Sequence, residues 1–355
     1  MREPRLLGPE FVQLIAEIDE FKGRWEAIGR LSPDRLGMLR KVATIESVAS
    51  STRIEGARLT DAQVETLLSN LEIQSFATRD EQEVAGYAEA MDLVFEAHAD
   101  LRLTENHIRQ LHQTLLRHSR KDERHRGAYK TLSNDVVAFD ADGRAIGVVF
   151  ATAMPFDTPR KMEELVAWTR KATAEQSLHP LVVTAVFIVT FLAIHPFQDG
   201  NGRLSRILTT LLLLRAGYAY VPYASLERVI EDNKDHYYKA LRRTQTTLDG
   251  DQPDWEPWIG FFLRCLKRQK DGLLRRLERE ADRDRLPEIS RLILAALEQT
   301  GRLSIAELEA VIGTNRNTLK VRLRELVAAG QVRRHGKARA TWYALPGLPS
   351  PGGDA

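Results

Sequence analysis

Twelve consecutive residues, 195–206, contain most of the side chains in this sequence that are suited to chemistry on a phosphate. They read HPFQDGNGRLSR, which puts an imidazole, a carboxylate, a glycine-rich loop and two guanidinium groups into one short segment. The glycines permit positive φ angles, so successive backbone N–H groups can converge on an anion. A helix beginning at this loop would add its partial positive charge. The segment is therefore a candidate polyphosphate site.

Each polar side chain of this segment has a chemistry that fits a phosphate reaction. Arg203 and Arg206 are three residues apart on one helix face and can hold distal phosphates through forked hydrogen bonds. Asp199 is an oxygen ligand suited to Mg²⁺, which takes one or two carboxylates together with substrate phosphates. His195 is the nearby base, able to accept a proton from a hydroxyl that attacks phosphorus. A plain turn between two helices would not need this combination.

The segment resembles the signature of the Fic domain family, HPFx(D/E)GNGRxxR, and matches it at every specified position. The resemblance implies a helical bundle with a hairpin flap, and transfer of AMP from ATP to a Ser, Thr or Tyr hydroxyl of a target protein with release of pyrophosphate. The intact Gly202 is similar to the nucleotide-transferring branch, because the related Doc-type branch has a lysine there and works as a kinase. The residues that the resemblance implies are His195 as the base, Asp199 as the Mg²⁺ ligand, and Gly200, Asn201, Gly202, Arg203 and Arg206 as nucleotide-binding residues.

A later segment, NKDHYYKALRRTQ, also resembles part of the Fic family. Tyr237 and Tyr238 are similar to aromatic residues that line the family's adenine pocket, and Gln245 stands where some members have an asparagine. Ordinary packing of a helix explains the two tyrosines equally well. Both roles therefore stay open for this pair.

Two stretches rich in valine and phenylalanine, upstream of the signature, predict a β-hairpin. They read NDVVAF and AIGVVF and flank a turn-forming cluster at 140–143. In the Fic family such a flap covers the nucleotide and accepts a target segment as an added strand, through main-chain hydrogen bonds. The resemblance implies that its edge nearest the phosphates consists of Gly147, Val148, Val149 and Phe150.

Far upstream, residues 51–56 read STRIEG. They resemble the (S/T)xxxE(G/N) inhibitory motif of Fic proteins, in which a glutamate from a preceding helix pairs with the second arginine of the signature. The resemblance implies that Glu55, with Ser51 in the same motif, faces Arg206 and obstructs the γ-phosphate. A carboxylate on that guanidinium would leave ATP misaligned or exclude it. Positioning of a water for removal of AMP is a second role that the resemblance implies for Glu55.

The chain that must position these residues is 355 residues long, with 43% hydrophobic and 28% charged residues. These ordinary values exclude a disordered chain, and the length predicts two or three domains. Cys265 is the single cysteine and can form no internal disulfide. No apolar leader and no apolar stretch of about 20 residues is found, so we expect a cytoplasmic protein that does not enter a membrane.

Helical periodicity dominates the chain and predicts an all-α fold. The longest apolar run, 181–194, predicts a helix buried on every side that ends immediately before His195. A single helix is expected over 226–246. The expected parts are an N-terminal helical region with the inhibitory motif at 1–100, a Fic core at 101–265, a charged helix or linker at 266–284, a winged helix domain at 285–346 and a disordered tail at 347–355.

Three short helical patterns after residue 284, followed by an alternating stretch at 331–345, have the order of a winged helix-turn-helix. Between 314 and 339 the local charge is +7, in a chain whose total is +2. A basic helix and wing are the footprint of a duplex DNA reader. Contacts in a homodimer or docking of a target explain the same surface, so these alternatives stay open. The basic residues are Arg316, Lys320, Arg322, Arg324, Arg333, Arg334, Lys337 and Arg339.

Two classes of function follow from the sequence. The first is an autoinhibited protein adenylyltransferase that uses ATP as substrate and Mg²⁺ as cofactor, and modifies a protein hydroxyl. The second is a DNA-binding regulator in which the Fic fold senses a nucleotide and seldom transfers it. UMP transfer, phosphate transfer and removal of AMP also stay open, because no residue named above reads the base decisively.

Overall fold

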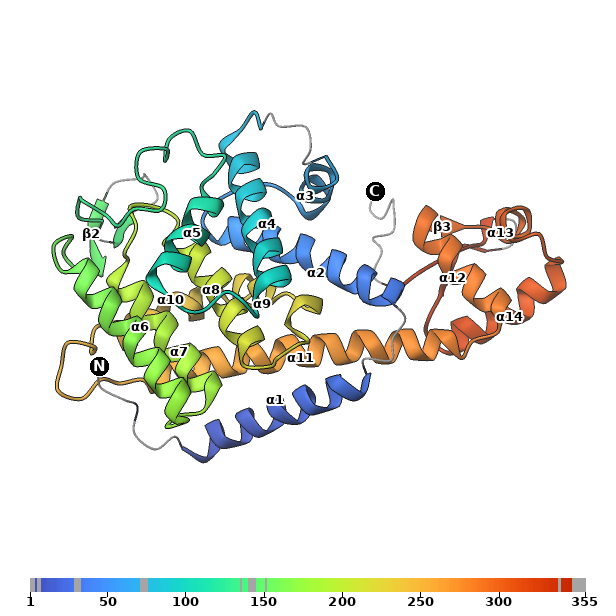
Figure 1. Cartoon of the computed structure of the whole chain (residues 1–355). Helices are drawn as coiled ribbons and strands as arrows, with labels where there is room; N and C mark the ends of the chain where they lie inside the picture. Colours follow the sequence, from blue (N-terminus) through green and yellow to red (C-terminus); the bar gives the residue numbers. More distant parts are fainter. Residues whose placement is uncertain are drawn as a thin grey trace. The chain divides into compact units, whose positions relative to one another are not determined.

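The computed structural model describes residues 4, 8–28, 33–70, 76–134, 136–139, 145–150, 152–337 and 340–346. The chain divides into two compact units, Met1–Leu273 and Leu274–Ala355. Helices dominate both units, and the strands are few and short (Figure 1). The all-α class predicted from the sequence is confirmed.

The first unit is a bundle of helices with one β-hairpin. Its elements are α1 (Pro9–Ile28), α2 (Pro33–Ile54), α3 (Asp61–Leu68), α4 (Arg79–Ala97), α5 (Glu105–Leu115), β1 (Val136–Phe139), β2 (Ala145–Phe150), α6 (Thr158–Glu175), α7 (Pro180–Ile194), α8 (Asn201–Arg215), the short 3-10 helix η1 (Val221–Tyr223), α9 (Leu226–Glu231) and α10 (Lys234–Gln245). Helix α11 (Glu256–Asp284) begins in this unit and continues into the second.

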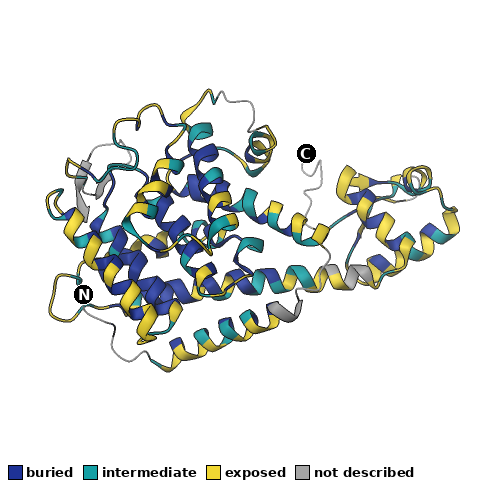
Figure 2. Cartoon of the chain, in the orientation of Figure 1, coloured by how far each residue is buried: buried dark blue, intermediate teal, exposed yellow. Residues whose placement is uncertain are grey.

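Helix α7 is the buried helix that the sequence predicts before His195. Nearly all of its side chains are buried, and α6, α8 and α10 pack against it (Figure 2). Pro180 occupies its first turn and Pro196 follows its end, so proline restricts the helix at both limits. His195, the residue after α7, is therefore carried on a rigid part of the core. Although α7 is apolar, no helix within the described ranges is long and apolar enough to cross a membrane.

The prediction of a single helix over 226–246 is wrong, because the structure has two helices in this range, α9 and α10. The break is at Asn233, whose backbone leaves the helical region at φ −126° and ψ 30°. The Asn233 Nδ2 donates to Val229 O at 2.8 Å, taking the carbonyl that a continuous helix would use. Competition of this kind between a short polar side chain and the helical backbone is the physical reason for the break.

The predicted hairpin is present as the antiparallel pair β1 and β2. Val136 pairs with Phe150 and Phe139 with Ala145, with irregular register between them. The turn cluster at 140–143 lies outside the described residues. Gly147, Val148, Val149 and Phe150 are the last residues of β2, and their place nearest the phosphates stays a prediction.

The second unit has the order of a winged helix-turn-helix. Leu297, Leu308, Leu319 and Leu323 belong to one buried core that joins its three helices. The two predicted wing strands are present, and a third, short strand that the sequence analysis missed pairs beside them in the order β3-β5-β4. Residues 347–355 and Arg339 lie outside the described residues. The elements are α12 (Glu288–Thr300), β3 (Arg302–Leu303), α13 (Ile305–Ile312), α14 (Arg316–Ala328), β4 (Arg333–His335) and β5 (Trp342–Ala344).

Candidate active site

A cavity of about 700 Å³ brings the loop that the sequence predicts to bind phosphate together with residues from distant parts of the first unit. His195 and Asp199 lie in its wall with the loop glycines. Glu55 reaches the same cavity from the end of α2, and Tyr238 from α10. Most of the residues proposed from the sequence therefore line one space.

His195 is held in an unusual backbone conformation at the end of α7. Its φ is 53° and its ψ 60°, a left-handed conformation that is uncommon for residues other than glycine. Its Nδ1 lies 3.3 Å from Leu192 O, and because a carbonyl only accepts, Nδ1 carries the proton. The lone pair is then on Nε2. Burial lowers the pKa of His195, which favours the neutral form that a general base requires.

The loop after His195 is closed by its own side chains. Asn201 Oδ1 accepts from Phe197 N at 2.9 Å, and Asn201 Nδ2 donates to Phe197 O at 2.6 Å. Gly200 has φ 79°, which glycine adopts without strain. Thus the Asn201 side chain shapes the loop, and only its backbone N–H can face a phosphate.

The loop leads directly into the N-terminus of α8. The first intrahelical bond runs from Leu204 N to Gly200 O at 2.9 Å, so the amides of residues 201–203 precede the helical ladder. Arg203, from the first turn, is 2% exposed. Its Nη1 lies 3.2 Å from Glu83 Oε2, yet Nε and Nη1 have no hydrogen-bond partner in the described part of the chain. Buried donors at a helix N-terminus that make no hydrogen bond within the described residues fit an anionic ligand.

The second arginine, Arg206, is held by Ser51 and Glu55, the two residues named in the motif at 51–56. Arg206 Nε donates to Ser51 Oγ at 2.8 Å, and its Nη2 donates to Ser51 O at 3.0 Å. The same Nη2 donates to Glu55 Oε1 at 2.7 Å. Burial acts to lower the pKa of Arg206, but the Glu55 carboxylate together with Tyr237 and Tyr87 outweighs burial and raises that pKa. The guanidinium is therefore fully charged.

Glu55 also lies directly over the glycine loop. A Cβ added at Gly202 would collide with the Glu55 carboxylate, so the carboxylate touches the face of the loop where a phosphate would sit. The helix α2 ends just before Glu55, and Gly56 follows it at φ 104°. The residue is thus both a helix-end glutamate and a cavity residue. Arg53 fixes this turn, because its Nε and Nη2 donate to Glu231 at 2.6 and 2.9 Å.

Asp199 is the one carboxylate of the loop. Its Oδ1 accepts from Gly200 N at 2.6 Å, while its Oδ2 lies 3.5 Å from Lys121 Nζ and 3.6 Å from Arg79 Nη2. Burial acts to raise its pKa, but Arg203, Gly200 N–H, Lys121 and Arg79 outweigh burial and lower it. The carboxylate is therefore ionised.

These surroundings decide how Mg²⁺ fits the site. No group of three or more His, Cys, Asp or Glu side chains suited to a metal is found among the described residues. Asp199 offers one hard oxygen ligand amid cations, which a lone divalent ion would not favour. With phosphate oxygens present the donor set suits Mg²⁺, which is commonly held by one or two carboxylates and the substrate phosphates.

Comparison with known protein families identifies two domains in the chain. Residues 102–213 match the family described as Fic/DOC family, and residues 286–333 match the family described as winged helix-turn-helix DNA-binding. The chain contains a Fic domain. A winged helix-turn-helix domain follows it at the C-terminal end.

Proteins similar to this chain carry the same domain. Two curated relatives are named protein adenylyltransferase Fic. The one from Drosophila grimshawi is 26% identical over 259 residues, 72% of this chain and 48% of that protein. The one from Nematostella vectensis is 26% identical over 272 residues, 75% of this chain and 58% of that protein. The chain thus spans about half the length of these relatives.

A solved structure is similar over almost the whole chain. It is a crystal structure of a Fic family protein from Desulfovibrio desulfuricans G20, with a TM-score of 0.61 and 26% identity. The similarity covers 99% of this chain and 100% of that one.

Both tyrosines of the pair on α10 line the cavity, but they are buried to different extents. Tyr237 is 4% exposed and packs on Trp258 and Phe261, and burial raises its pKa to about 12. Tyr238 is half exposed on the cavity wall, and Gln245, about two turns beyond it on α10, lines the same wall. Tyr237 is thus a mostly buried part of the cavity wall, whereas Tyr238 exposes more of its surface to a ligand.

The sequence analysis did not identify His112, which holds the Fic signature in place. His112 Nε2 donates to Asp199 O at 3.0 Å, and its Nδ1 accepts from Gly127 N at 2.8 Å. The His112 ring stacks on Phe197 with centroids 3.8 Å apart. Burial lowers its pKa to about 4. No local pattern distinguishes this histidine from a surface one, because its partners are far away in sequence.

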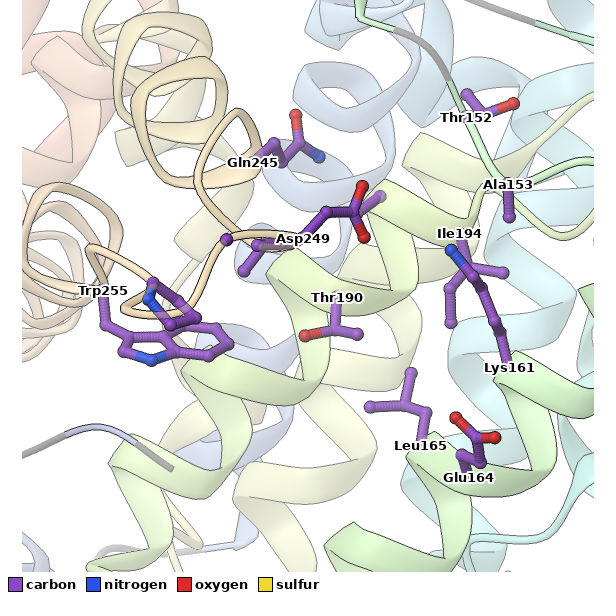
Figure 3. A pocket seen from close by; sticks show the side chains of 14 residues that line it. Thr152, Ala153, Lys161, Glu164, Leu165, Thr190, Ile194, Gln245, Asp249 and Trp255 are labelled. Atoms are coloured by element: carbon purple, nitrogen blue, oxygen red, sulfur yellow. The ribbon is translucent and has the colours of Figure 1, made fainter. Parts of the chain in front are cut away.

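A second cavity of about 530 Å³ lies on the other side of Gln245. Figure 3 shows Glu164 and Leu165 of α6 across Thr190 from Asp249 and Trp255. Thr190 Oγ1 and Trp255 Nε1 have no hydrogen-bond partner within the described residues. Gln245 lines both cavities and is 9% exposed, so it forms part of the wall between them.

Proposed function

We propose that this chain is an autoinhibited protein adenylyltransferase, which transfers AMP from ATP to a Ser, Thr or Tyr hydroxyl of a target protein and of itself. One observation carries the proposal. A neutral imidazole with its lone pair on Nε2 shares a cavity with a helix N-terminus and with the buried Arg203, which has donors without a hydrogen-bond partner among the described residues. A base beside a polyphosphate cradle is the minimum that transfer from ATP to a hydroxyl requires.

The phosphates are bound at the N-terminus of α8. The amides of residues 201–203 and the guanidinium of Arg203 take the oxygens nearest the loop, while Arg206 takes the γ-phosphate. This arrangement places the α-phosphorus toward His195. Asp199 would hold Mg²⁺ together with phosphate oxygens, and the ion would offset charge on them when bound.

The chemical step needs one proton transfer and one displacement. His195 Nε2 accepts the proton of the target hydroxyl, and the hydroxyl oxygen forms a bond to the α-phosphorus. The bond between the α-phosphorus and the bridging oxygen breaks in line, and pyrophosphate leaves. Arg203 and Arg206 stabilise the charge that develops on the leaving group. Preorganised positioning by α7 and α8 supplies the rest.

The contact between Glu55 and Arg206 supports a resting state that is inhibited. Glu55 occupies Arg206 Nη2 and covers Gly202, the two places where outer phosphates need to bind. ATP then binds in a pose that is not aligned with His195, or is excluded. Strands β1 and β2 would accept the target segment by main-chain bonds, so side chains of the target contribute little to selection.

Incubation with α-labelled ATP and Mg²⁺ tests the proposal. We expect covalent label on the Glu55→Gly protein, weak label on the unaltered protein and none on Glu55→Gly with His195→Ala. The same reaction with γ-labelled ATP should leave no label, which separates AMP transfer from phosphate transfer. Equal labelling with UTP would contradict the choice of ATP. Absence of label from Glu55→Gly protein would overturn the proposed activity.

A DNA-binding regulator is the second candidate function, favoured by the surface of α14. Arg316, Lys320 and Arg324 are exposed at successive turns, while Leu319 and Leu323 are buried on the opposite face. The wing adds exposed basic residues at 333, 334 and 337. A basic helix face beside a basic wing suits a phosphate backbone. This function can coexist with AMP transfer, since it uses the other unit of the chain.

A further inference from the structure

A buried lysine joins the two ends of the flap to the end of α7. Lys130 is 3% exposed, and its Nζ donates to Asn134 Oδ1 at 2.7 Å, to Thr152 Oγ1 at 2.8 Å and to Ile194 O at 3.1 Å. Asn134 precedes β1 and Thr152 follows β2, so they are the two roots of the hairpin. One ammonium group therefore contacts both roots and the last residue before His195.

Asn134 extends this network to His195 itself. Its Nδ2 donates to His195 O at 3.2 Å and to Phe197 O at 2.6 Å. These bonds require the amide to be oriented with Oδ1 toward Lys130, because an ammonium group can only donate. The Lys130 backbone adds a bond from its N–H to Pro196 O at 2.8 Å. Residues 194–197 are thus fixed at every carbonyl by Lys130 or Asn134.

The conformation of His195 shows why such fixing is needed. A φ of 53° is costly for a residue with a Cβ, and such a conformation persists only where the surroundings determine it. The bond from Asn134 to His195 O is the polar contact that holds this peptide. The orientation of the imidazole follows from the peptide that carries it.

We propose that Lys130 is a positioning residue, which fixes the base His195 and both roots of the flap through one buried ammonium group. This inference rests on the proposed AMP transfer. Lys130 does not touch the reacting atoms and acts through Asn134 and Thr152. The role explains why a lysine is buried at this point, where a charged group is expensive unless several acceptors surround it. The Lys130 ammonium group would then determine both the alignment of His195 and the alignment of the strand that receives the target segment.

Kinetics of a Lys130→Met variant in the Glu55→Gly protein tests the role. Methionine keeps the length of the side chain and removes its hydrogen bonds. We expect kcat for self-labelling to fall about 100-fold, the scale expected for a catalytic group misplaced by about 1 Å. The KM for ATP should stay within about twofold, because the α8 cradle is untouched. Lys130→Arg should restore much of kcat, and Lys171→Met, an exposed lysine on α6, should have no effect. An unchanged kcat in Lys130→Met would overturn the proposal.

Hydrogen exchange provides a readout that does not depend on activity. In Lys130→Met the amides of 130–134 and 195–198 should exchange faster, while those of 206–214 in α8 keep their rates. If the amides of 130–134 and 195–198 exchange as fast in the parent protein as in Lys130→Met, the proposal is overturned. This readout stays decisive even if the Glu55→Gly protein carries no label and the proposed activity fails. Should Lys130→Met not fold, Thr152→Val removes one acceptor of Lys130 Nζ, together with the 2.9 Å bond that Thr152 Oγ1 donates to Asn134 Oδ1. It should lower kcat in the same direction by a smaller factor, and an unchanged kcat would exclude the link to the flap.

Discussion

Glu55 Oε1 accepts a 2.7 Å hydrogen bond from Arg206 Nη2, across 151 residues of sequence. Ser51, one helical turn before Glu55, holds the same guanidinium from its hydroxyl and its carbonyl. The motif that resembles the family's inhibitory motif therefore has two parts. Ser51 sets the position of the arginine, and Glu55, which lines the cavity, occupies its Nη2. Variants of the two residues should consequently behave differently.

Removal of the Glu55 carboxylate should raise activity in steps. Glu55→Gln keeps the volume over Gly202 but loses the charge, whereas Glu55→Gly clears both. A hydrogen bond to a charged group contributes about 1.5–3 kcal/mol, so we expect about 10-fold or more labelling for Glu55→Gly and less for Glu55→Gln. Labelling rates with α-labelled ATP measure the series.

Ser51→Ala is the matched control for the same site. It removes the bond to Arg206 Nε and leaves Glu55 in place, so activity should not rise. If Ser51→Ala labels as strongly as Glu55→Gly, the inhibition comes from the position of Arg206 and not from occupation by Glu55.

The pH dependence of labelling should reflect the buried state of His195. The base must be neutral, and burial lowers its pKa below the ordinary value of 6.5. Activity should therefore persist below pH 6.5 and fall only at more acidic pH. The acid limb of kcat/KM in the Glu55→Gly protein measures this pKa. A limb centred above pH 6.5 would show that a different group is being titrated.

His112 should make the stability of the first unit depend on pH. Its pKa is about 4 in the folded protein and 6.5 in an ordinary setting, so the unfolded chain binds more protons between these values. Stability is complete above pH 6.5 and is lost as pH falls toward 4. A shift of this size predicts a loss of about 2 kcal/mol between pH 7 and pH 5. Urea unfolding of wild type and His112→Gln at both pH values measures it. A variant that loses as much stability as wild type would exclude His112 as the source.

The shared wall at Gln245 predicts a change in nucleotide selectivity. If the base of ATP lies along Tyr238 toward Gln245, then Gln245→Ala opens the route into the second cavity. The Glu55→Gly, Gln245→Ala protein should use an ATP analogue with a bulky group on the adenine amine about tenfold better than its parent, in line with the discrimination that pocket size provides. Leu248→Ala enlarges the second cavity without opening the wall and should give no gain. Equal gains from both variants would mean that Gln245 is not the barrier.

The exposed face of α14 should determine any binding to DNA. Lys320→Ala and Arg324→Ala should each weaken duplex binding and reduce the slope of log affinity against log salt by about 1. Arg322 is paired with Glu325 at 2.8 Å and is partly buried, so Arg322→Ala serves as the control with a smaller effect. Fluorescence anisotropy over a range of salt concentrations gives the slopes. Unchanged slopes for Lys320→Ala and Arg324→Ala would leave the winged domain without a role in DNA binding.

Sequence patterns predicted the features whose causes are local. The limits of α7 follow from an apolar run and a proline, and the hairpin follows from two β-rich stretches around a turn cluster. The pairing of Glu55 with Arg206 was expected from a motif resemblance and is present, with Glu55 in the wall of the cavity. The break at Asn233 was missed, because one side chain competing for one carbonyl leaves the helical pattern unchanged.

The residues that support the site could not be predicted in this way. His112 contacts Asp199 O across 87 residues, and Asn134 contacts Phe197 O across 63 residues. A histidine on an amphipathic helix, such as His112, and a lysine in a polar loop, such as Lys130, are ordinarily exposed. Their burial results from tertiary packing, which neither the residue type nor its spacing in the sequence predicts.

Arg206 does not line the cavity, whereas Glu55, its partner, does. The Arg206 Nη1 is buried and has no hydrogen-bond partner among the described residues, while Nη2 is occupied by Glu55. Under the proposed function, a phosphate would reach this guanidinium only after Glu55 moves. Displacement of one side chain would then make two donors available together. A partner that draws Glu55 aside would increase the fraction of active molecules and leave the rate of each active molecule unchanged.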